Sequence, residues 1–191
     1  MATILIAYGT GEGQTAKVAE RITETLRDRG HDVTAVDVST DPSPSVADSD
    51  AVLVGASIHV GKHQQSVLTF VREHRDELAS RPTGFFQVSL SSVADDEQRR
   101  AEAAGYVESF IEETGWHPDR IGLFGGALRY SEYGFLKRLL MKRIAKDATG
   151  DTDTSRDYEY TDWVEVEQFS NDFAAFVEGR LGVGPPADGS A

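Results

Sequence analysis

A glycine-rich loop between an apolar run and a helical pattern constrains the fold of this chain more than any other segment. The run ILIAY at 4–8 has strand character, the loop GTGEGQT covers 9–15, and apolar side chains then recur at three- and four-residue steps. Backbone N–H groups of such a loop converge with the positive end of the helix dipole, which suits an anion. Thr10 and Thr15 can add hydroxyl donors. The segment predicts a phosphate site. The alternative is a strand–helix turn that binds no ligand and in which the glycines only allow a tight backbone.

The loop differs from two common phosphate-binding motifs. No Lys-Ser or Lys-Thr pair follows Gly13, and the glycines are spaced G-x-G-x-G rather than G-x-G-x-x-G. The segment resembles the FMN-phosphate loop of flavodoxins, whose pattern is matched here by Ile6, Tyr8, Thr10, Gly13, Thr15, Ala19 and Ile22. The resemblance implies FMN as the ligand, with its phosphate held by Thr10, Gly11, Glu12, Gly13, Gln14 and Thr15.

The rest of the chain alternates apolar runs with helical patterns. Strands are expected at 32–38, 51–56, 84–90 and 121–126, and helices at about 63–78, from 95 or 96 to 114, and at 162–181, the last capped by Thr161 or Asp162. This alternation predicts an α/β fold with a doubly wound, five-stranded parallel sheet. The flavodoxin resemblance implies the strand order 2-1-3-4-5. Residues 1–181 are expected to form one flavodoxin-like domain, followed by a disordered tail at 182–191.

In that strand order, the loops after the first, third and fourth strands meet at the carboxyl edge of the sheet. The flavin ring would then be flanked by Ser57, Ile58, His59, Val60, Gly61, Ser89, Leu90, Ser91 and Ser92. Flavodoxins that only carry electrons usually cover the flavin with aromatic side chains, but 57–62 and 89–95 contain no Trp, Tyr or Phe. An uncovered flavin face indicates an enzyme. His59 could donate to a reduced flavin or to a carboxylate, or be a solvated loop residue.

Residues 127–161, between the fifth strand and the last helix, depart further from an ordinary flavodoxin. Within them, 133–148 is expected to be a helix in which a leucine stripe runs beside the basic residues Arg138, Lys142 and Lys146. Such a helix suits a membrane surface or an apolar substrate that bears carboxylates. The alternative is a surface helix whose leucines pack on the sheet while its cations extend into water.

Several short motifs together carry a closer resemblance. They are GASI at 55–58, a helix containing His63, Phe70 and Val71, GALRY at 126–130, LMK at 140–142, DTDT at 151–154 and YTDW at 160–163. In this order they are similar to the menaquinone-dependent protoporphyrinogen IX dehydrogenase family, flavodoxin-like enzymes that bind FMN. The similarity runs from residue 3 to about residue 178.

This resemblance implies oxidation of protoporphyrinogen IX late in haem biosynthesis, with electrons passing through FMN to a quinone. It also implies that the 127–161 segment handles the substrate, through Arg129, Tyr130, Arg138 and Lys142, and Arg129 could pair with a propionate. No side chain need act as an acid or base, so no catalytic residue is expected. The acidic sequence at 91–97 and the residues Val60 and Lys62 depart from the family pattern, which a changed substrate would explain.

Composition narrows the remaining possibilities. The net charge of −13 is typical of a salt-adapted surface or of an ordinary acidic protein, and it argues against nucleic-acid binding. The chain has no cysteine, and Asp151 and Asp153 lack the ligand spacing of a calcium loop, so no metal is expected. No spanning or signal-peptide pattern occurs, so we expect a cytoplasmic protein, with 134–148 as a candidate for peripheral contact with the inner face of the cell membrane.

Two other functions stay open on the sequence alone. One is a flavodoxin acting as an electron-transfer protein, which would dock redox partners through its acidic surface. The other is a non-redox phosphate-binding or regulatory domain. Two features argue against the electron-transfer protein. The expected flavin loops contain no aromatic residue, and the chain has the expected basic helix at 133–148.

Overall fold

The computed structural model describes residues 1–41, 44–93, 97–128, 146, 149, 153 and 157–183. Its strands are β1 (Thr3–Tyr8), β2 (Asp32–Asp37), β3 (Ala51–His59), β4 (Lys62–His63), β5 (Thr83–Ser89), β6 (Arg120–Gly125), β7 (Ala127–Leu128) and β8 (Tyr158–Glu159). Its helices are α1 (Gln14–Asp28), α2 (Gln65–Glu73), α3 (Arg75–Ala79), the 3₁₀ helix η1 (Leu90–Val93), α4 (Glu97–Thr114) and α6 (Trp163–Leu181).

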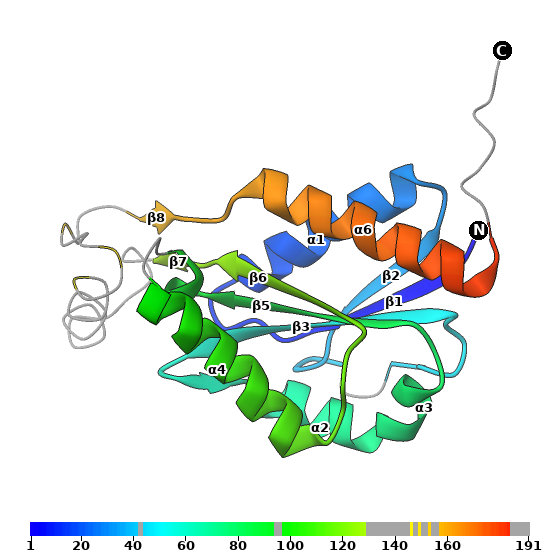
Figure 1. The fold of residues 1–191 in the computed structure, drawn as a ribbon, viewed down its shortest axis with the longest axis horizontal. Coiled ribbons are helices and arrows are strands. Elements are labelled where there is room, and N and C mark those ends of the chain that lie inside the picture. The colour runs from blue at the N-terminus through cyan, green and yellow to red at the C-terminus, as the bar shows by residue number, and fades with distance from the viewer. Residues whose placement is uncertain are drawn as a thin grey trace, which may run out of the picture.

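The central sheet is parallel, with the strand order β2-β1-β3-β5-β6. This confirms the expected order, since β5 and β6 are the fourth and fifth strands of the sequence prediction. Helices α1 and α6 cover one face of the sheet, and α2, α3 and α4 cover the other (Figure 1). The carboxyl ends of the strands therefore form one edge, and β7 and β8 lie beyond it (Figure 1).

Successive side chains along each strand point to opposite faces of the sheet, so the core is divided into two apolar layers. On β1, Ile4 and Ile6 face α1 and α6, whereas Leu5 and Ala7 face the opposite layer. Because both faces are covered, β3 is apolar from residue 51 to residue 54 without interruption. Within the sheet, the ring of Phe86 on β5 lies against its partner Gly55 on β3, where an added Cβ would lie 2.1 Å from the ring.

The segment expected as a loop at 57–62 is a β-hairpin instead. Strand β3 continues to His59 and pairs antiparallel with β4, with Ile58 opposite His63 and His59 opposite Lys62. The turn consists of Val60 and Gly61, with φ angles of 50° and 73°. Two left-handed residues match the right-handed twist of the flanking strands, which is why such a turn can close a two-residue hairpin.

The helix expected to run to about residue 78 is divided into α2 and α3. The division falls at His74, which has φ −104° and ψ 13°. Its ring lies 4.9 Å from that of Phe70, and its Nδ1 is 3.0 Å from Glu77 Oε1. These contacts hold His74 in a conformation that interrupts the regular helical turn.

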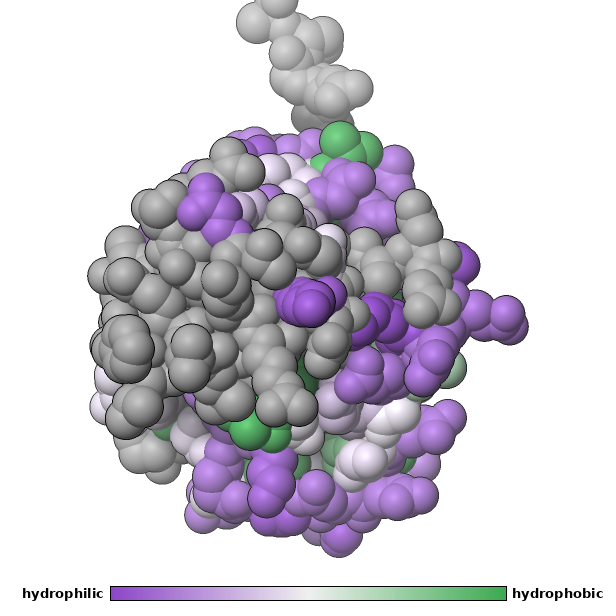
Figure 2. Space-filling view, turned by 90° about the vertical axis from the view of Figure 1, so that its left-hand side faces the viewer, coloured by the Kyte–Doolittle hydropathy of each residue, from purple (hydrophilic) through white to green (hydrophobic). Residues whose placement is uncertain are grey.

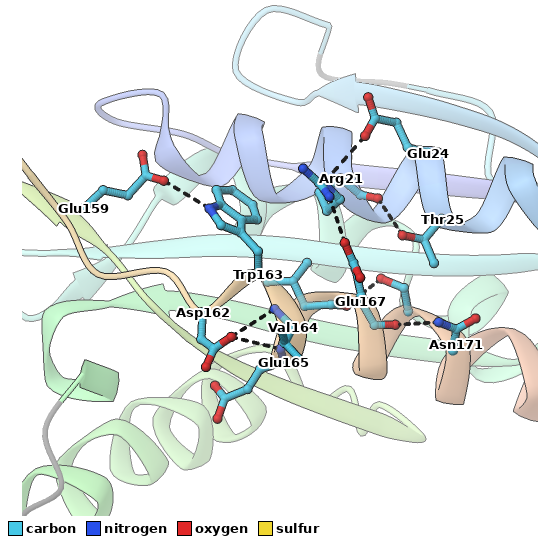
Figure 3. A network of polar contacts seen from close by, with 12 residues as sticks. Arg21, Glu24, Thr25, Glu159, Asp162, Trp163, Val164, Glu165, Glu167 and Asn171 are labelled. Carbon is cyan, nitrogen blue, oxygen red and sulfur yellow. Dashed lines mark hydrogen bonds and ion pairs between the residues drawn. The ribbon is translucent and has the colours of Figure 1, made fainter.

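Helices α1 and α6 are joined side by side by charged and aromatic contacts (Figure 3). Arg21 Nη1 lies 2.7 Å from Glu167 Oε1, and the Arg21 guanidinium lies over the ring of Trp163. Asp162 is the N-cap of α6, because its side chain accepts hydrogen bonds from the N–H groups of Val164 and Glu165. Of the two residues proposed as the cap, Asp162 has this role and Thr161 has another.

Several sequence predictions fall outside the described residues. They concern the cap at Asp95 or Asp96, most of the basic helix at 133–148, the substrate residues Arg129, Tyr130, Arg138 and Lys142, and residues 184–191 of the tail.

Candidate functional site

The phosphate loop, residues 9–15, turns tightly at the carboxyl end of β1. Gly9 N donates to Gly55 O at 2.9 Å, and a Cβ at Gly9 would lie 2.6 Å from Val67 Cγ2, so only glycine allows this approach. Gly13, at φ 86°, makes the left-handed turn into α1. Its N–H donates to Thr10 Oγ1 at 2.9 Å, so the Thr10 side chain closes the loop.

Thr15, on the first turn of α1, carries a hydroxyl that suits a ligand. Its side chain is 1% exposed, and Oγ1 has no hydrogen-bond partner among the described residues. A buried hydroxyl without a partner is costly, so a ligand oxygen at this point would relieve it. The first N–H groups of a helix also lack acceptors within the helix, and the first turn of α1 carries no acidic residue. The loop therefore fits a phosphate.

The phosphate loop forms one side of a cleft at the carboxyl edge of the sheet. The cleft is lined by Thr10, Gly11, Glu12, Gln14 and Thr15 from the loop, by Ser57, Ile58 and His59 from β3, by Val88 of β5 and Leu90 of η1, and by Gly126 and Ala127, which follow β6. The three segments predicted to hold FMN are thus brought together. Figure 2 looks onto this end of the molecule, where the described residues are mostly hydrophilic, with small apolar patches between them.

The other predicted site residues lie around this cleft. Val60 and Gly61 form the tip of the β3–β4 hairpin, and Val60 is 64% exposed. Ser89 and Ser92 join their hydroxyls at 2.8 Å and hold the start of η1 against the end of β5. The side chain of Ser91 is outside the described part of the chain.

Gln64 is a site residue that the sequence prediction missed. Its Oε1 accepts from Ser57 N at 3.0 Å, and its Nε2 donates to Ser57 Oγ. A Cβ at Gly11 would lie 4.0 Å from the same Nε2, so Gln64 lies between the hairpin and the phosphate loop. Nothing in the sequence distinguishes this glutamine from Gln65, which is exposed.

A second buried polar pair anchors the hairpin to the sheet. Gln87 Nε2 donates to Ala103 O at 3.0 Å, so Gln87 Oε1 is the atom that accepts from His63 Nε2, also at 3.0 Å. The His63 ring packs at 4.9 Å from that of Phe110. Burial lowers the pKa of His63, which favours the neutral imidazole.

The sequence prediction of the site also omitted three other residues, which are Thr161, Gly126 and Ala127. Thr161 accepts from Gln14 Nε2 at 2.8 Å and donates to Gly125 O at 2.7 Å. The sequence signal was the position of Thr161 before a helix, which indicated a cap but not this bridge.

Two negative findings apply to the described residues. None of their helices is both long enough and apolar enough to cross a membrane. None of their His, Asp and Glu side chains gather in a group of three or more that could hold a metal ion.

Comparison with known proteins gives close agreement over most of the chain. A family model described as a flavodoxin domain matches residues 5–155. A protoporphyrinogen IX dehydrogenase (quinone) of Leishmania major is 36% identical over 174 residues, which cover 90% of this chain and 74% of that protein. The protein of the same name from Escherichia coli strain K12 is 33% identical over 174 residues, covering 91% of this chain and 96% of that protein.

Solved structures agree on the fold. Oxidised flavodoxin 1 from Bacillus cereus has a TM-score of 0.51 at 13% identity, covering 92% of this chain and 97% of that one. Flavodoxin from Fusobacterium nucleatum, bound to flavin mononucleotide, has a TM-score of 0.51 at 9% identity, covering 94% and 99%. On the family match and the relatives' identity and coverage, the chain belongs to the flavodoxin domain family and, within it, to the family of the protoporphyrinogen IX dehydrogenases (quinone).

Proposed function

We propose that this chain is an FMN-dependent enzyme that oxidises protoporphyrinogen IX and passes the electrons to a quinone, as a step of haem biosynthesis. The observation that carries the proposal is the similarity to the Escherichia coli dehydrogenase, which covers 96% of that enzyme's length and so includes the segment after β6. The proposal rests on the whole chain rather than on the phosphate loop, which flavodoxins of many functions could share.

FMN is the cofactor, and we assign its phosphate and its ring to different parts of the cleft. Thr10, Gly13, Thr15 and the N-terminus of α1 would hold the phosphate, and the β3–β4 hairpin and η1 would flank the ring. When bound, FMN supplies the redox chemistry, because it can take up an electron pair from one molecule and release it to another. The side chains described above would bind and orient it.

The lining of the cleft supports an enzyme over an electron carrier. No Phe, Tyr or Trp is among the described residues that line it. A flavin bound there would keep a face free for a macrocyclic substrate. In each two-electron step the porphyrinogen would lose two hydrogens and one quinone would become a quinol, so atoms and electrons balance.

The substrate contacts remain a proposal from the sequence. Arg129 and Tyr130 directly follow β7, whose Ala127 lines the cleft, and the basic residues Arg138 and Lys142 come shortly after. Porphyrinogen propionates would pair with these cations. We also propose that the protein works in the cytoplasm, with 134–148 contacting the inner face of the cell membrane, where a quinone would be reached.

Anaerobic mixing of the FMN-loaded protein with protoporphyrinogen IX tests this function. We expect loss of the oxidised-flavin absorbance together with the appearance of porphyrin fluorescence, and recovery of the flavin absorbance when a menaquinone analogue is added. A flavin that binds but stays oxidised would contradict the proposal and favour the electron-transfer protein.

A further inference from the structure

A hydrogen-bonded bridge links the two sides of the cleft through one hydroxyl. Thr161 Oγ1 lies 2.7 Å from Gly125 O and 2.8 Å from Gln14 Nε2. A carbonyl oxygen can only accept, so the single hydroxyl hydrogen of Thr161 is donated to Gly125 O. The lone pairs of the same hydroxyl then accept the amide hydrogen of Gln14. Every donor and acceptor in the bridge therefore has a fixed role.

The first end of the bridge belongs to the phosphate loop. Gln14 is the first residue of α1, its side chain is 5% exposed, and it lines the cleft next to Thr15. Its amide is therefore held on the side of the loop where the phosphate would bind. A shift of Thr161 would move the hydroxyl that accepts from this side chain.

The second end, Gly125 O at the end of β6, adjoins the opposite side of the cleft. We call this side the β7–β8 wall, and it consists of residues 126–128 and 158–160. Gly126 and Ala127 line the cleft. Tyr160 N donates to Gly126 O at 3.0 Å, and Ala127 pairs with Glu159 in the antiparallel β7–β8 ladder. Thr161 is the next residue along the chain, so it fixes the point where this wall meets α6.

A second contact between the same parts is weaker. Lys17 Nζ lies 3.1 Å from Glu159 Oε2, and Glu159 Oε1 also accepts from Trp163 Nε1 (Figure 3). Both side chains of the Lys17–Glu159 pair are substantially exposed, so water screens the pair. The Thr161 bridge is shielded better, because Gln14 is buried.

We propose that Thr161 is a positioning residue that couples the phosphate loop to the β7–β8 wall, so that FMN binding at the loop steadies the wall and a ligand at the wall strengthens FMN binding. The coupling is reciprocal, since two sites that bias one another in binding must do so by the same factor. The part that concerns a porphyrin at the wall rests on the proposed function. The part that concerns FMN does not.

The variants Thr161→Val and Thr161→Ser test the coupling. Valine keeps the shape but loses the hydroxyl, whereas serine keeps it. Thr25→Val is the matched control, since Thr25 Oγ1 donates within α1, to Arg21 O at 3.0 Å. From flavin fluorescence, we expect FMN to bind about tenfold more weakly to Thr161→Val and within about twofold of the parent affinity to the other two variants.

Hydrogen exchange distinguishes this coupling from a purely structural role of Thr161, because it measures whether FMN binding protects the β7–β8 wall. In the unaltered protein, FMN should slow exchange at residues 157–163 more than at residues 116–120, which lie at the opposite edge of the sheet. In Thr161→Val this difference should disappear. A structural role alone would lower the stability of the FMN-free variant and leave both the FMN affinity and the difference in exchange intact, and that result would overturn the proposal.

The coupling can be tested even if Thr161→Val does not fold, and its outcome can be told apart from that of the proposed function. If Thr161→Val does not fold, absence of the FMN-dependent difference in the unaltered protein overturns the coupling. If that protein binds FMN and shows the difference but does not oxidise protoporphyrinogen IX, the proposed function fails and the coupling stands. Where the function holds, protoporphyrin IX should tighten FMN binding to the unaltered protein but not to Thr161→Val.

Discussion

Arg29 makes a bidentate ion pair with Glu178 and so connects the end of α1 to the end of α6. Arg29 Nε lies 2.8 Å from Glu178 Oε1 and Nη2 lies 2.9 Å from Oε2, while His31 Nε2 lies 3.1 Å from Oε1. Ala2 N donates to the other nitrogen of the His31 ring, so the cluster also holds the start of the chain. Glu178 is only 6% exposed, so water has little access to it. Loss of its charge would therefore leave the Arg29 guanidinium without its carboxylate partner.

We expect Glu178→Gln to lower the free energy of unfolding by about 1.5–3 kcal/mol at neutral pH, the usual range for a charged hydrogen bond. The Arg29 hydrogen bonds hold the pKa of Glu178 below its ordinary value of 4.5. The unfolded state then binds more protons in acid, so this stabilisation is present above about pH 4.5 and is lost as the pH falls through the lower folded pKa. Urea unfolding from pH 7 downward should show the two proteins converging in acid. Glu113→Gln, at an exposed pair with Arg72, is the control and should change little.

Thr15→Val should separate ligand binding from stability. Without its hydroxyl the loop loses a phosphate contact, so FMN binding should weaken by about 1–3 kcal/mol. The FMN-free protein should instead gain about 1 kcal/mol, because a buried hydroxyl without a described partner is removed. Titration with FMN and urea unfolding measure the two effects. Unchanged FMN affinity would contradict the assignment of the loop.

Val60→Asn should stabilise the protein by about 1 kcal/mol. Val60 has φ 50°, a conformation that is unfavourable for a β-branched side chain and that asparagine tolerates. The side chain is 64% exposed, so little packing is lost. Urea unfolding of the FMN-free protein checks the change, and a loss of stability would show that Val60 makes a contact that offsets its backbone strain.

His63→Gln should remove part of the pH dependence of folding. Burial lowers the pKa of His63 below its ordinary value of 6.5, so the unfolded state binds more protons just below that pH. The stabilisation is therefore complete above about pH 6.5 and decreases as the pH falls toward the folded pKa. Glutamine can still donate to Gln87 but does not titrate. The difference in unfolding free energy between the parent and the variant should change between pH 7 and pH 5, and a constant difference would contradict the shift.

The strand–loop–helix unit at the N-terminus could be predicted from sequence because its signals are local. Glycines, hydroxyls and the apolar period all lie within residues 4–22, and the alternation of strands and helices then fixes which loops share an edge. The β3–β4 hairpin could not be predicted, since valine is among the least suitable residues for the left-handed turn at Val60. The Thr161 bridge was equally hidden, because Gln14 and Thr161 are 147 positions apart and only the folded chain brings them together.

The double variant Arg138→Glu with Lys142→Glu tests the substrate segment, whose role is predicted from the sequence. Reversing two charges should repel porphyrinogen propionates and an anionic membrane surface alike, so turnover or binding to anionic lipid vesicles should fall. FMN affinity should not change, because we assign FMN to the cleft lined by residues 10–12, 14, 15, 57–59, 88, 90, 126 and 127, and these two cations to the substrate. Steady-state kinetics with protoporphyrinogen IX and vesicle sedimentation measure the two effects separately. If turnover and vesicle binding both match those of the parent, the basic stripe is only a solvated face, and recognition of the propionates must come from cations elsewhere, such as Lys62 on the hairpin.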